Sequence, residues 1–382
     1  MTETVLITGG AGFIGSHLGD ELVRAGYRVR ALDSLVEQVH GGEQQRPAYL
    51  ADEIELIAGD VRNGEVVRGA LEGVDAVCHL GARVGVGQSM YQPAEYASAN
   101  TAGTGVLLQA LLEHRVRKVV VASSMSVYGE GAYEPVPAAE RTREQLERGE
   151  WNPRGRDGEE LRPVPTPETK EPSLASVYAL TKYDQERLCL LHGAAYGVPT
   201  VALRFFNVYG PRQALSNPYT GVLAIFAARL LNDRPPLVYE DGEQRRDFVF
   251  VTDVARACRV ALERDGADGR AVNIGSGRSS SVLDIAEALA RVLGKQHEPE
   301  VPRRFRAGDI RHCFADVTLA RETLGFEAEV PLDQGLAELA SWLEGQAATD
   351  RFDEAATELA ERGLTDLISG FGPASPGDAR LR

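Results

Sequence analysis

The chain has 382 residues, of which 43% are apolar and 25% charged, which excludes a disordered or fibrous chain and fits about two folded domains. The formal net charge of −15 at pH 7 argues against nucleic acid as a partner, because nucleic-acid-binding proteins usually carry a basic face. The four cysteines lie far apart, without metal-ligand spacing, and no apolar run reaches the roughly 18 residues of a membrane helix. Because no leader-like segment precedes Thr4, we expect a cytoplasmic protein with neither a metal site nor a membrane partner.

The first segment has the pattern of a strand, a helix and a second strand. Val5–Thr8 is short, apolar and β-branched, and apolar residues recur at helical spacing over Ile14–Ala25. A second strand is expected over Val29–Leu32. Such a unit requires a parallel sheet with a right-handed crossover.

The same alternation continues along the chain. Further buried strands are expected at Ile54–Ala58, Ala76–His79, Lys118–Ala122 and Thr200–Phe205. Helices are expected between them, at Ala102–His114 and Ser176–Tyr196. Strands that alternate with helices in this way predict an α/β protein with a doubly wound parallel sheet.

The pattern divides the chain into a large domain over residues 1–205, a part over 206–344 that is mainly a smaller C-terminal α/β substrate-binding domain, and a tail over 345–382. Within the large domain, residues 131–172 are polar, rich in Pro, Glu and Arg, and longer than an ordinary connection. Two interpretations remain open for this insertion: a segment that lies over the site, or a surface excursion without a role.

The later part of the chain has weaker patterns. A helix is expected over Gly221–Asn232 and a strand near Leu237. In the tail an amphipathic helix is expected over Phe352–Gly363, followed by a disordered end rich in Gly, Pro, Ser and Asp. The sequence assigns no function to this tail.

A glycine-rich turn joins the first strand to the first helix. Gly9, Gly12 and Gly15 are spaced as GxxGxxG, where a tight turn and a close approach to pyrophosphate need residues without a Cβ. The amide donors and the dipole of the following helix then favour the anion. This combination predicts a Rossmann-like, dinucleotide-binding domain.

Asp33 ends the second strand, where a carboxylate can accept hydrogen bonds from both ribose hydroxyls and would repel a 2′-phosphate. No arginine follows it at once to bind such a phosphate. The cofactor expected is therefore NAD rather than NADP, and the alternative for Asp33 is a solvated loop residue.

A serine, a tyrosine and a lysine form the candidate catalytic group. SSMSVYG, which begins at Ser123, follows a buried strand, and Tyr178 and Lys182 form YxxxK on one face of a helix. A lysine ammonium lowers the pKa of a nearby phenol, which can then take a hydroxyl proton, while the serine, Ser124, orients the substrate oxygen. The catalytic residues expected are Ser124, Tyr178 and Lys182.

These motifs resemble those of the extended short-chain dehydrogenase/reductases, and specifically the nucleotide-sugar epimerase/dehydratase family. The resemblance runs from Thr4 to about Trp342 and includes UDP-glucose and dTDP-L-rhamnose 4-epimerases. It rests, in chain order, on ITGGAGFIGSHL, HLGARVGVGQS, SSMSVYG, YALTK, LRFFNVYGPRQ, RRDFVFVTDVA and RAGDIRHCFAD.

Carried over position by position, the resemblance implies two sets of ligand-binding residues. NAD would be surrounded by Gly9, Gly12, Phe13, Ile14, Gly15, Asp33, Ser34, Asp60, Val61, Leu80, Gly81, Ala82, Asn100, Ser123, Tyr178, Lys182 and Phe205. The substrate would contact Val86, Ser124, Tyr178, Asn207, Val222, Arg246 and Arg306. In the second set Asn207 and the two arginines match positions that hold the nucleotide, and guanidinium groups do bind phosphate in bidentate fashion.

The residues after the serine indicate the reaction. Relatives that remove water carry an Asp-Glu pair there, whereas this chain has Met125 and Ser126. The chemistry that remains is oxidation at sugar carbon 4, rotation of the keto sugar and its reduction on the opposite face, which is 4-epimerisation of a UDP- or dTDP-hexose. The insertion resembles the dTDP-L-rhamnose type. Gly81 and Val84 depart from the usual pattern, and Arg83 is the candidate to replace a lost lysine charge.

Four alternatives compete with an epimerase. A dehydratase or decarboxylase of the same family would usually keep an acidic residue near Ser126, and a net NAD-consuming dehydrogenase would use the same scaffold. A non-catalytic NAD sensor would typically lack Tyr178 and Lys182, and a structural module would need no site residues. The resemblance also implies a homodimer, paired through the helices expected at Ala102–His114 and Ser176–Tyr196. The sequence leaves the nucleotide and the sugar open.

Overall fold

The computed structural model describes residues 2–41, 45–217, 219, 221–306, 309–346 and 348–367. For Arg306 and residues 365–367 only the backbone is described. The predicted disordered end of the tail therefore lies mostly outside the described residues. In the part of the chain that the structure describes, no helix is long and apolar enough to cross a membrane.

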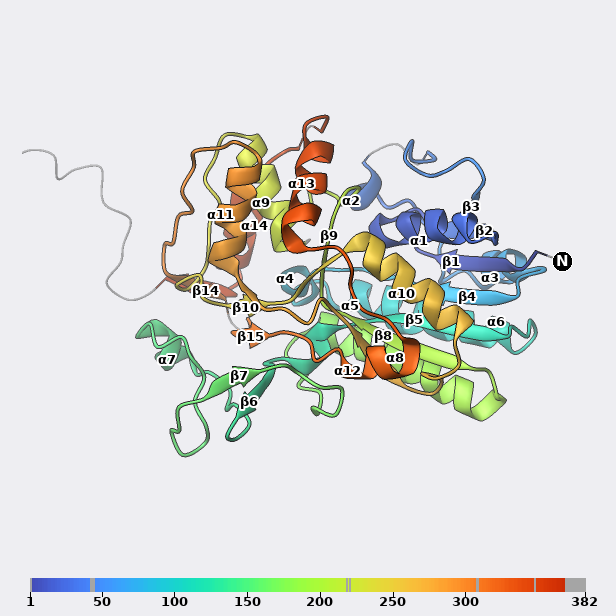
Figure 1. Ribbon diagram of the computed structural model, residues 1–382, viewed down its shortest axis with the longest axis horizontal. Coiled ribbons are helices and arrows are strands. Elements are labelled where there is room, and N and C mark those ends of the chain that lie inside the picture. The colour runs from blue at the N-terminus through green and yellow to red at the C-terminus, as the bar shows by residue number, and fades with distance from the viewer. Residues whose placement is uncertain are drawn as a thin grey trace, which may run out of the picture.

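Seven parallel strands form the central sheet, in the order β12-β8-β5-β4-β1-β2-β3 (Figure 1). Their bounds are β1 Thr4–Thr8, β2 Arg28–Asp33, β3 Glu55–Ala58, β4 Ala76–His79, β5 Lys118–Ser124, β8 Thr200–Phe205 and β12 Ala271–Ile274. The chain runs outward from β1 to β3 and returns to β4 on the other side of β1. This reversal creates a crevice at the carboxyl ends of β1 and β4, where ligands bind in such sheets.

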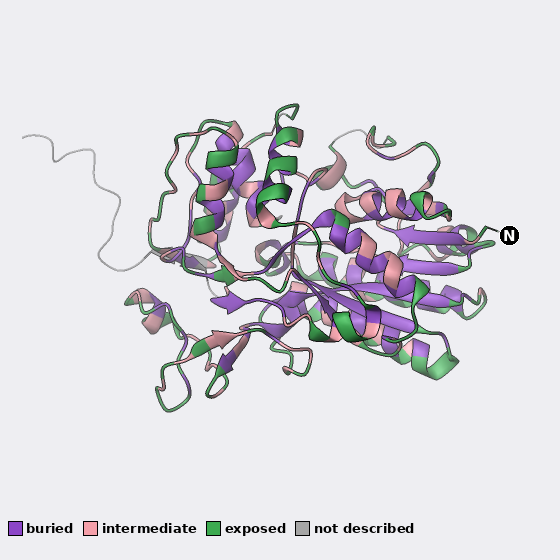
Figure 2. Cartoon of the chain, in the orientation of Figure 1, coloured by how far each residue is buried: buried purple, intermediate pink, exposed green. Residues whose placement is uncertain are grey.

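Helices cover both faces of the sheet because successive strand residues point to opposite sides. Val5 and Ile7 pack into one core with the first and tenth helices, and Leu6 packs into another core on the opposite face. The inner strands of the sheet are buried, whereas the edge strand formed by residues 55–58 is only partly covered and the helices expose their outer sides (Figure 2). The covering helices are α1 Phe13–Arg24, α3 Gly64–Leu71, α6 Gly103–Leu111, α8 Val177–Tyr196, α10 Val251–Glu263 and α12 Thr318–Leu324.

Short elements shape the loops at the carboxyl edge. They are α2 Glu37–His40, α4 Val86–Ser89, α5 Pro93–Tyr96, a π-helix over Ala97–Ala102 and a 3₁₀ helix over Met125–Tyr128. The predicted doubly wound sheet is confirmed, and the strands and helices predicted within residues 1–205 differ from the observed ones only at their ends. The largest difference is the helix expected to reach His114, which ends at Leu111.

The smaller lobe has its own core, formed mainly by three helices whose apolar faces meet: α9 Val222–Leu231, α11 Val282–Val292 and α13 Leu332–Leu343. Its short strands are β9 Asn207–Tyr209, β10 Arg245–Arg246, β11 Phe248–Phe250, β13 Ser280–Ser281, β14 Arg304–Arg306 and β15 His312–Cys313. Within the part predicted to be mainly the smaller domain, α10 and β12 return to the large sheet. The strand expected near Leu237 is wrong, because Leu237 forms only an isolated bridge with Glu300.

The insertion and the tail complete the fold. The insertion contains β6 Ala132–Glu134, α7 Arg143–Glu147 and β7 Arg162–Val164, and its two strands pair antiparallel. It projects from the body of the molecule below the smaller lobe in Figure 1. The tail forms α14 Phe352–Glu361 and β16 Thr365–Leu367, which pairs with β14. The helix predicted in the tail is confirmed.

Candidate active site

A cavity of about 680 Å³ opens at the carboxyl edge of the sheet. Its wall combines the glycine-rich turn, the loops after β2, β3, β4 and β5, the start of α8, and residues of the smaller lobe. All residues predicted to surround NAD line this cavity, with the exception of Asn100. The structure therefore brings together side chains that the sequence spreads over some 200 positions of the chain, from Gly9 to Phe205.

The glycine-rich turn fits a pyrophosphate. Gly9 has a φ of +69°, and a Cβ at Gly15 would lie 2.1 Å from the carbonyl oxygen of Gly9, so neither position suits a larger residue. The first turn of α1 has no side-chain cap, and Phe13 and Ile14 line the cavity there. Uncapped amide groups at a helix N-terminus bind anions.

Asp33 is buried at the end of β2, not a solvated loop residue. Its carboxylate accepts hydrogen bonds from the backbone amides of Ala11, at 3.0 Å, and Leu35, at 2.9 Å. The ring nitrogen Nε2 of His40 lies 3.5 Å from one oxygen of this carboxylate. A carboxylate has about four acceptor positions, so at least one remains for a ribose hydroxyl. Asp60 also lines the cavity, but Arg62 donates to its carboxylate, at 2.6 Å from Nη2, and this hydrogen bond lowers the pKa of Asp60.

Asn100 lies behind the cavity wall and does not line it. Its side chain is fully buried, accepts from the amide of Arg83 at 2.7 Å, and donates to the carbonyl oxygen of Arg83 and to Thr181 Oγ1. Asn100 therefore fixes the loop after β4 from outside, while Leu80, Gly81 and Arg83 face the cavity. The sequence could not distinguish a residue that lines the cavity from one that supports its wall.

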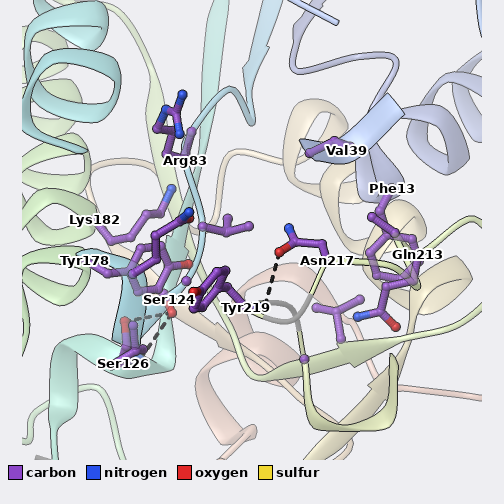
Figure 3. A pocket seen from close by; sticks show the side chains of 18 of the residues that line it. Phe13, Val39, Arg83, Ser124, Ser126, Tyr178, Lys182, Gln213, Asn217 and Tyr219 are labelled. Atoms are coloured by element: carbon purple, nitrogen blue, oxygen red, sulfur yellow. Dashed lines mark hydrogen bonds between the residues drawn. The ribbon is translucent and has the colours of Figure 1, made fainter. Parts of the chain in front are cut away.

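Ser124 and Tyr178 meet at the catalytic end of the cavity (Figure 3). Ser124 ends β5, and its Oγ accepts hydrogen bonds from Ser126 Oγ, at 2.9 Å, and from the Ser126 amide. Burial raises the pKa of Tyr178, whereas its hydrogen bond with Ser124 lowers it. Ser89 Oγ accepts from the Tyr178 amide at 3.0 Å, which anchors the start of α8.

Lys182 follows Tyr178 by one helical turn and is 3% exposed. Burial lowers the pKa of its ammonium from 10.5 to about 7. Its Nζ donates to Gln185 Oε1 at 2.6 Å, and Gln185 in turn donates to Thr104 and to the carbonyl oxygen of Gly81. The expected lowering of the Tyr178 pKa by this lysine is not seen, because Lys182 is turned toward Gln185. The sequence analysis did not identify Gln185.

The residues after Ser124 carry no acid. Met125 and Ser126 are buried in the 3₁₀ helix, 8% and 7% exposed. Among the described residues, the acidic side chains that line the cavity are Asp33, Asp60 and Asp309. The first two belong to the cofactor end, and Asp309 lies 3.7 Å from Arg246. The wall next to Ser124 therefore lacks the acid that elimination of water needs.

The predicted substrate residues Val86, Asn207, Val222 and Arg246 all line the cavity. The Asn207 side-chain oxygen is buried without a hydrogen-bond partner, which suits a bound ligand. Arg246 donates to the carbonyl oxygens of Arg245, Arg311 and Ile310, so its guanidinium is held by backbone. The backbone of Arg306 lies in β14, and the side chain of this predicted substrate residue lies outside the described part of the chain.

The interpretation of residues 131–172 as a segment over the site is wrong, since none of them lines the cavity. Polar contacts hold this insertion against other parts of the chain. The side chain of Arg141 is 4% exposed and donates to Glu240 at 2.8 Å and to the carbonyl oxygen of Asp309. Trp151 packs near Phe305, with ring centroids 6.4 Å apart. The cavity is instead lined by residues of α14 and by Gln213, Ala214, Asn217, Tyr219 and Gly221.

Comparison with known proteins places the chain among nucleotide-sugar enzymes. The family model described as NAD dependent epimerase/dehydratase matches residues 5–275. The dTDP-L-rhamnose 4-epimerase of Burkholderia thailandensis is 36% identical over 351 residues, 89% of this chain and 95% of that protein. The UDP-N-acetyl-alpha-D-glucosaminuronate decarboxylase of Bacillus cytotoxicus is 31% identical, over 90% of this chain and 98% of that protein. The solved structure of the Thermus thermophilus UDP-glucose 4-epimerase complex with NAD has a TM-score of 0.72 at 30% identity, and the match covers 90% of this chain and 100% of that one.

Proposed function

Because the chain belongs to the NAD-dependent epimerase/dehydratase family, we propose that it is a nucleotide-sugar 4-epimerase. Family membership confirms the resemblance identified in the sequence and the predicted cofactor, NAD. The observation that carries the reaction type is the catalytic end of the cavity, which Ser124 and Tyr178 line together and where Met125 and Ser126 replace the acids of a dehydratase.

The residues of the chain have distinct tasks in this reaction. NAD, when bound in the cleft, supplies the oxidation and reduction at the sugar carbon. Tyr178 takes the proton of the sugar hydroxyl and returns it, and Ser124 orients that hydroxyl by hydrogen bonding. Lys182 lies one helical turn after Tyr178 and is held by Gln185, and when it is protonated it brings a positive charge to this end of the cavity. Asp33 and the turn at Gly9 hold the cofactor in one position. Ser124 and Tyr178 therefore act in both the oxidation and the reduction.

The sugar has to turn within the cavity between the two half-reactions, and the wall around the loop after β4 suits this. Val84, Val86 and Met90 line it, and they are 44%, 46% and 44% exposed in the structure. Such side chains form no directional hydrogen bonds, so they hold a sugar without fixing one face. A wall of this kind also fits an apolar carbon 6 better than a carboxylate.

We therefore propose a UDP- or dTDP-linked hexose as the substrate, with dTDP-L-rhamnose as the first candidate. The similarity to the Burkholderia thailandensis enzyme supports this choice, as does the apolar wall. The decarboxylase relative favours one alternative, loss of carbon dioxide from a nucleotide-linked uronic acid. An NAD-binding regulator without activity would have no need for the Ser124 and Tyr178 pair.

The test is incubation of the purified protein, without added NAD, with dTDP-L-rhamnose, dTDP-glucose, UDP-glucose, UDP-galactose and UDP-glucuronate, followed by NMR of each sugar. We expect conversion of one sugar to its 4-epimer. The Tyr178→Phe variant should lose at least about 100-fold in rate, because it removes the proton-transferring group, and it should still bind NAD. Release of water or carbon dioxide, or no turnover by protein that contains NAD, would contradict the proposal.

A further inference from the structure

The tail after α13 returns to the cavity and lines it with one face of α14. Phe352, Ala355, Ala356 and Leu359 line the cavity, and their spacing places them on one side of the helix. Leu364, just after the helix, also lines it. The buried members of this face, Phe352, Ala355 and Leu359, are each about 5–6% exposed. The tail thus forms an apolar cover on the cavity.

Both ends of this cover are attached to the smaller lobe. At the N-terminal end Asp350 lies 3.5 Å from Arg229 and 3.3 Å from Arg234, and the guanidinium of Arg229 stacks over the Phe352 ring at 5.1 Å. At the C-terminal end β16 pairs with β14. The cover is therefore part of the smaller lobe, and its middle is free to contact the other side of the cavity.

The middle of α14 contacts the loop after β4 through Glu358. The Tyr219 hydroxyl donates to Glu358 Oε2 at 2.5 Å, and the Tyr91 hydroxyl lies 2.9 Å from the same oxygen and 2.6 Å from the Tyr219 hydroxyl. The hydrogen bond from Tyr219 lowers the pKa of Glu358, so the carboxylate form is favoured. Arg362 adds a second contact, with its guanidinium 4.4 Å from the centre of the Tyr91 ring.

Packing contacts connect Tyr219 with the catalytic residue Tyr178. Tyr219 lines the cavity and appears beside it in Figure 3, and a Cβ at Gly85 would lie 3.0 Å from both Tyr219 Cβ and the Tyr96 hydroxyl. The Tyr96 ring packs edge-on against the Tyr178 ring, with centroids 6.4 Å apart. The position of α14 is thereby linked to the end of the cavity where the sugar reacts.

We propose that α14 is a cover that opens and closes over the bound nucleotide sugar, and that Glu358 is the positioning residue that holds it closed. The identity of the bound molecule rests on the proposed function. A helix that only filled space would need no carboxylate between tyrosines of two other segments, and its cavity-facing side would not be lined by alanines, which leave room for a ligand. Because entry and release require the contact to open, its loss should act on substrate binding more than on the chemical step.

The test compares Glu358→Ala with Glu361→Ala, an exposed glutamate on the same helix. Loss of hydrogen bonds to a charged group should raise the KM for the nucleotide sugar about tenfold, while kcat stays within about twofold. Glu358→Gln should have a KM close to that of the wild-type protein, because the glutamine amide oxygen still accepts a hydrogen bond from a tyrosine. Equal KM values for Glu358→Ala and Glu361→Ala, or a fall in kcat at constant KM, would overturn the proposal.

Limited trypsin digestion tests the cover without turnover. Cleavage after Arg362, followed by mass spectrometry, should be faster in Glu358→Ala than in Glu361→Ala, at the same thermal unfolding temperature. UDP or dTDP should slow cleavage of the wild-type protein, because a bound nucleotide holds the cover closed. If no sugar in the NMR assay is converted, the proposed epimerase function fails. Equal cleavage rates in the two variants would instead show that Glu358 does not hold α14.

Discussion

At the scale of single residues, the buried Lys182 should make the unfolding free energy depend on pH. Burial lowers the Lys182 pKa from 10.5 to about 7, so between these values the unfolded chain binds a proton that the folded protein does not. Stability therefore rises with pH across this window. Between pH 7 and pH 9 the wild-type protein should gain about 2 kcal/mol of unfolding free energy relative to Lys182→Met.

Urea unfolding of cofactor-free protein at the two pH values measures this difference. Lys182→Met removes the titrating group while keeping much of the apolar stem, so all other titrations cancel in the comparison. Parallel pH profiles of the wild-type protein and the variant would contradict the low pKa. The structure gives a second sign of burial, since the Lys182 Nζ is hydrogen-bonded to Gln185 rather than to an acidic side chain.

The same scale shows what residue patterns can and cannot predict. Asp33 and Tyr178 could be proposed from the sequence because each occupies a fixed place relative to a strand end or a helix start, and both line the cavity. Asn100 was expected to line the cavity, but its hydrogen bonds to Arg83 place it behind the wall. Gln185 was missed because a glutamine on a helix has no distinctive pattern until its partners, such as Lys182, are known.

At the scale of elements, the first strand, turn and helix were predicted because their spacing is imposed by close backbone contact. The contact can be tested at Gly15, where a Cβ would overlap the carbonyl oxygen of Gly9. Gly15→Ala should lower the unfolding free energy by about 2–3 kcal/mol, since backbone must move to relieve the overlap. It should also weaken NAD binding, because the same turn receives the pyrophosphate.

Gly69→Ala is the matched control for this change. Gly69 also lies within a helix, α3, but a Cβ there would have no neighbour within 4 Å. This substitution should therefore stabilise the protein by about 0.5–1 kcal/mol, through the higher helix propensity of alanine. Urea unfolding of both variants tests whether the unfolding free energy falls in Gly15→Ala and rises in Gly69→Ala. Titration with NAD tests whether only Gly15→Ala weakens cofactor binding. Similar losses of stability would show that the overlap at Gly15 is not the cause.

Elements without such local contacts were placed less well. Residues 131–172 are polar and irregular, and whether they cover the site depends on distant partners such as Glu240, which binds Arg141. The helix at Phe352–Glu361 was predicted from its amphipathic pattern, but the pattern does not say what its apolar face meets. Only the folded arrangement shows that this face lines the cavity.

At the scale of the whole molecule, one surface remains to be explained. Leu180 and Leu191 on α8 are 46% and 57% exposed, and their spacing of eleven residues returns them to the same face of the helix. Leu112, at the end of α6, is 50% exposed, and α6 packs beside α8. We propose that a second copy of the chain covers this face, so that helices of two protomers pack together.

The proposed homodimer can be tested by Leu191→Glu, which places a charge in the centre of the face. Light scattering after size exclusion should give the mass of a dimer for the wild-type protein and of a monomer for the variant, because an unpaired charge is costly in an apolar interface. Val292→Glu is the control, as Val292 is 40% exposed at the end of α11 in the smaller lobe. A monomeric wild-type protein, or dissociation by both variants, would contradict an interface at α8.

Since α8 also carries Tyr178 and Lys182, loss of the dimer should reduce turnover only if pairing of the helices keeps the start of α8 in place. A monomeric variant with full activity would therefore show that each protomer holds its own catalytic group.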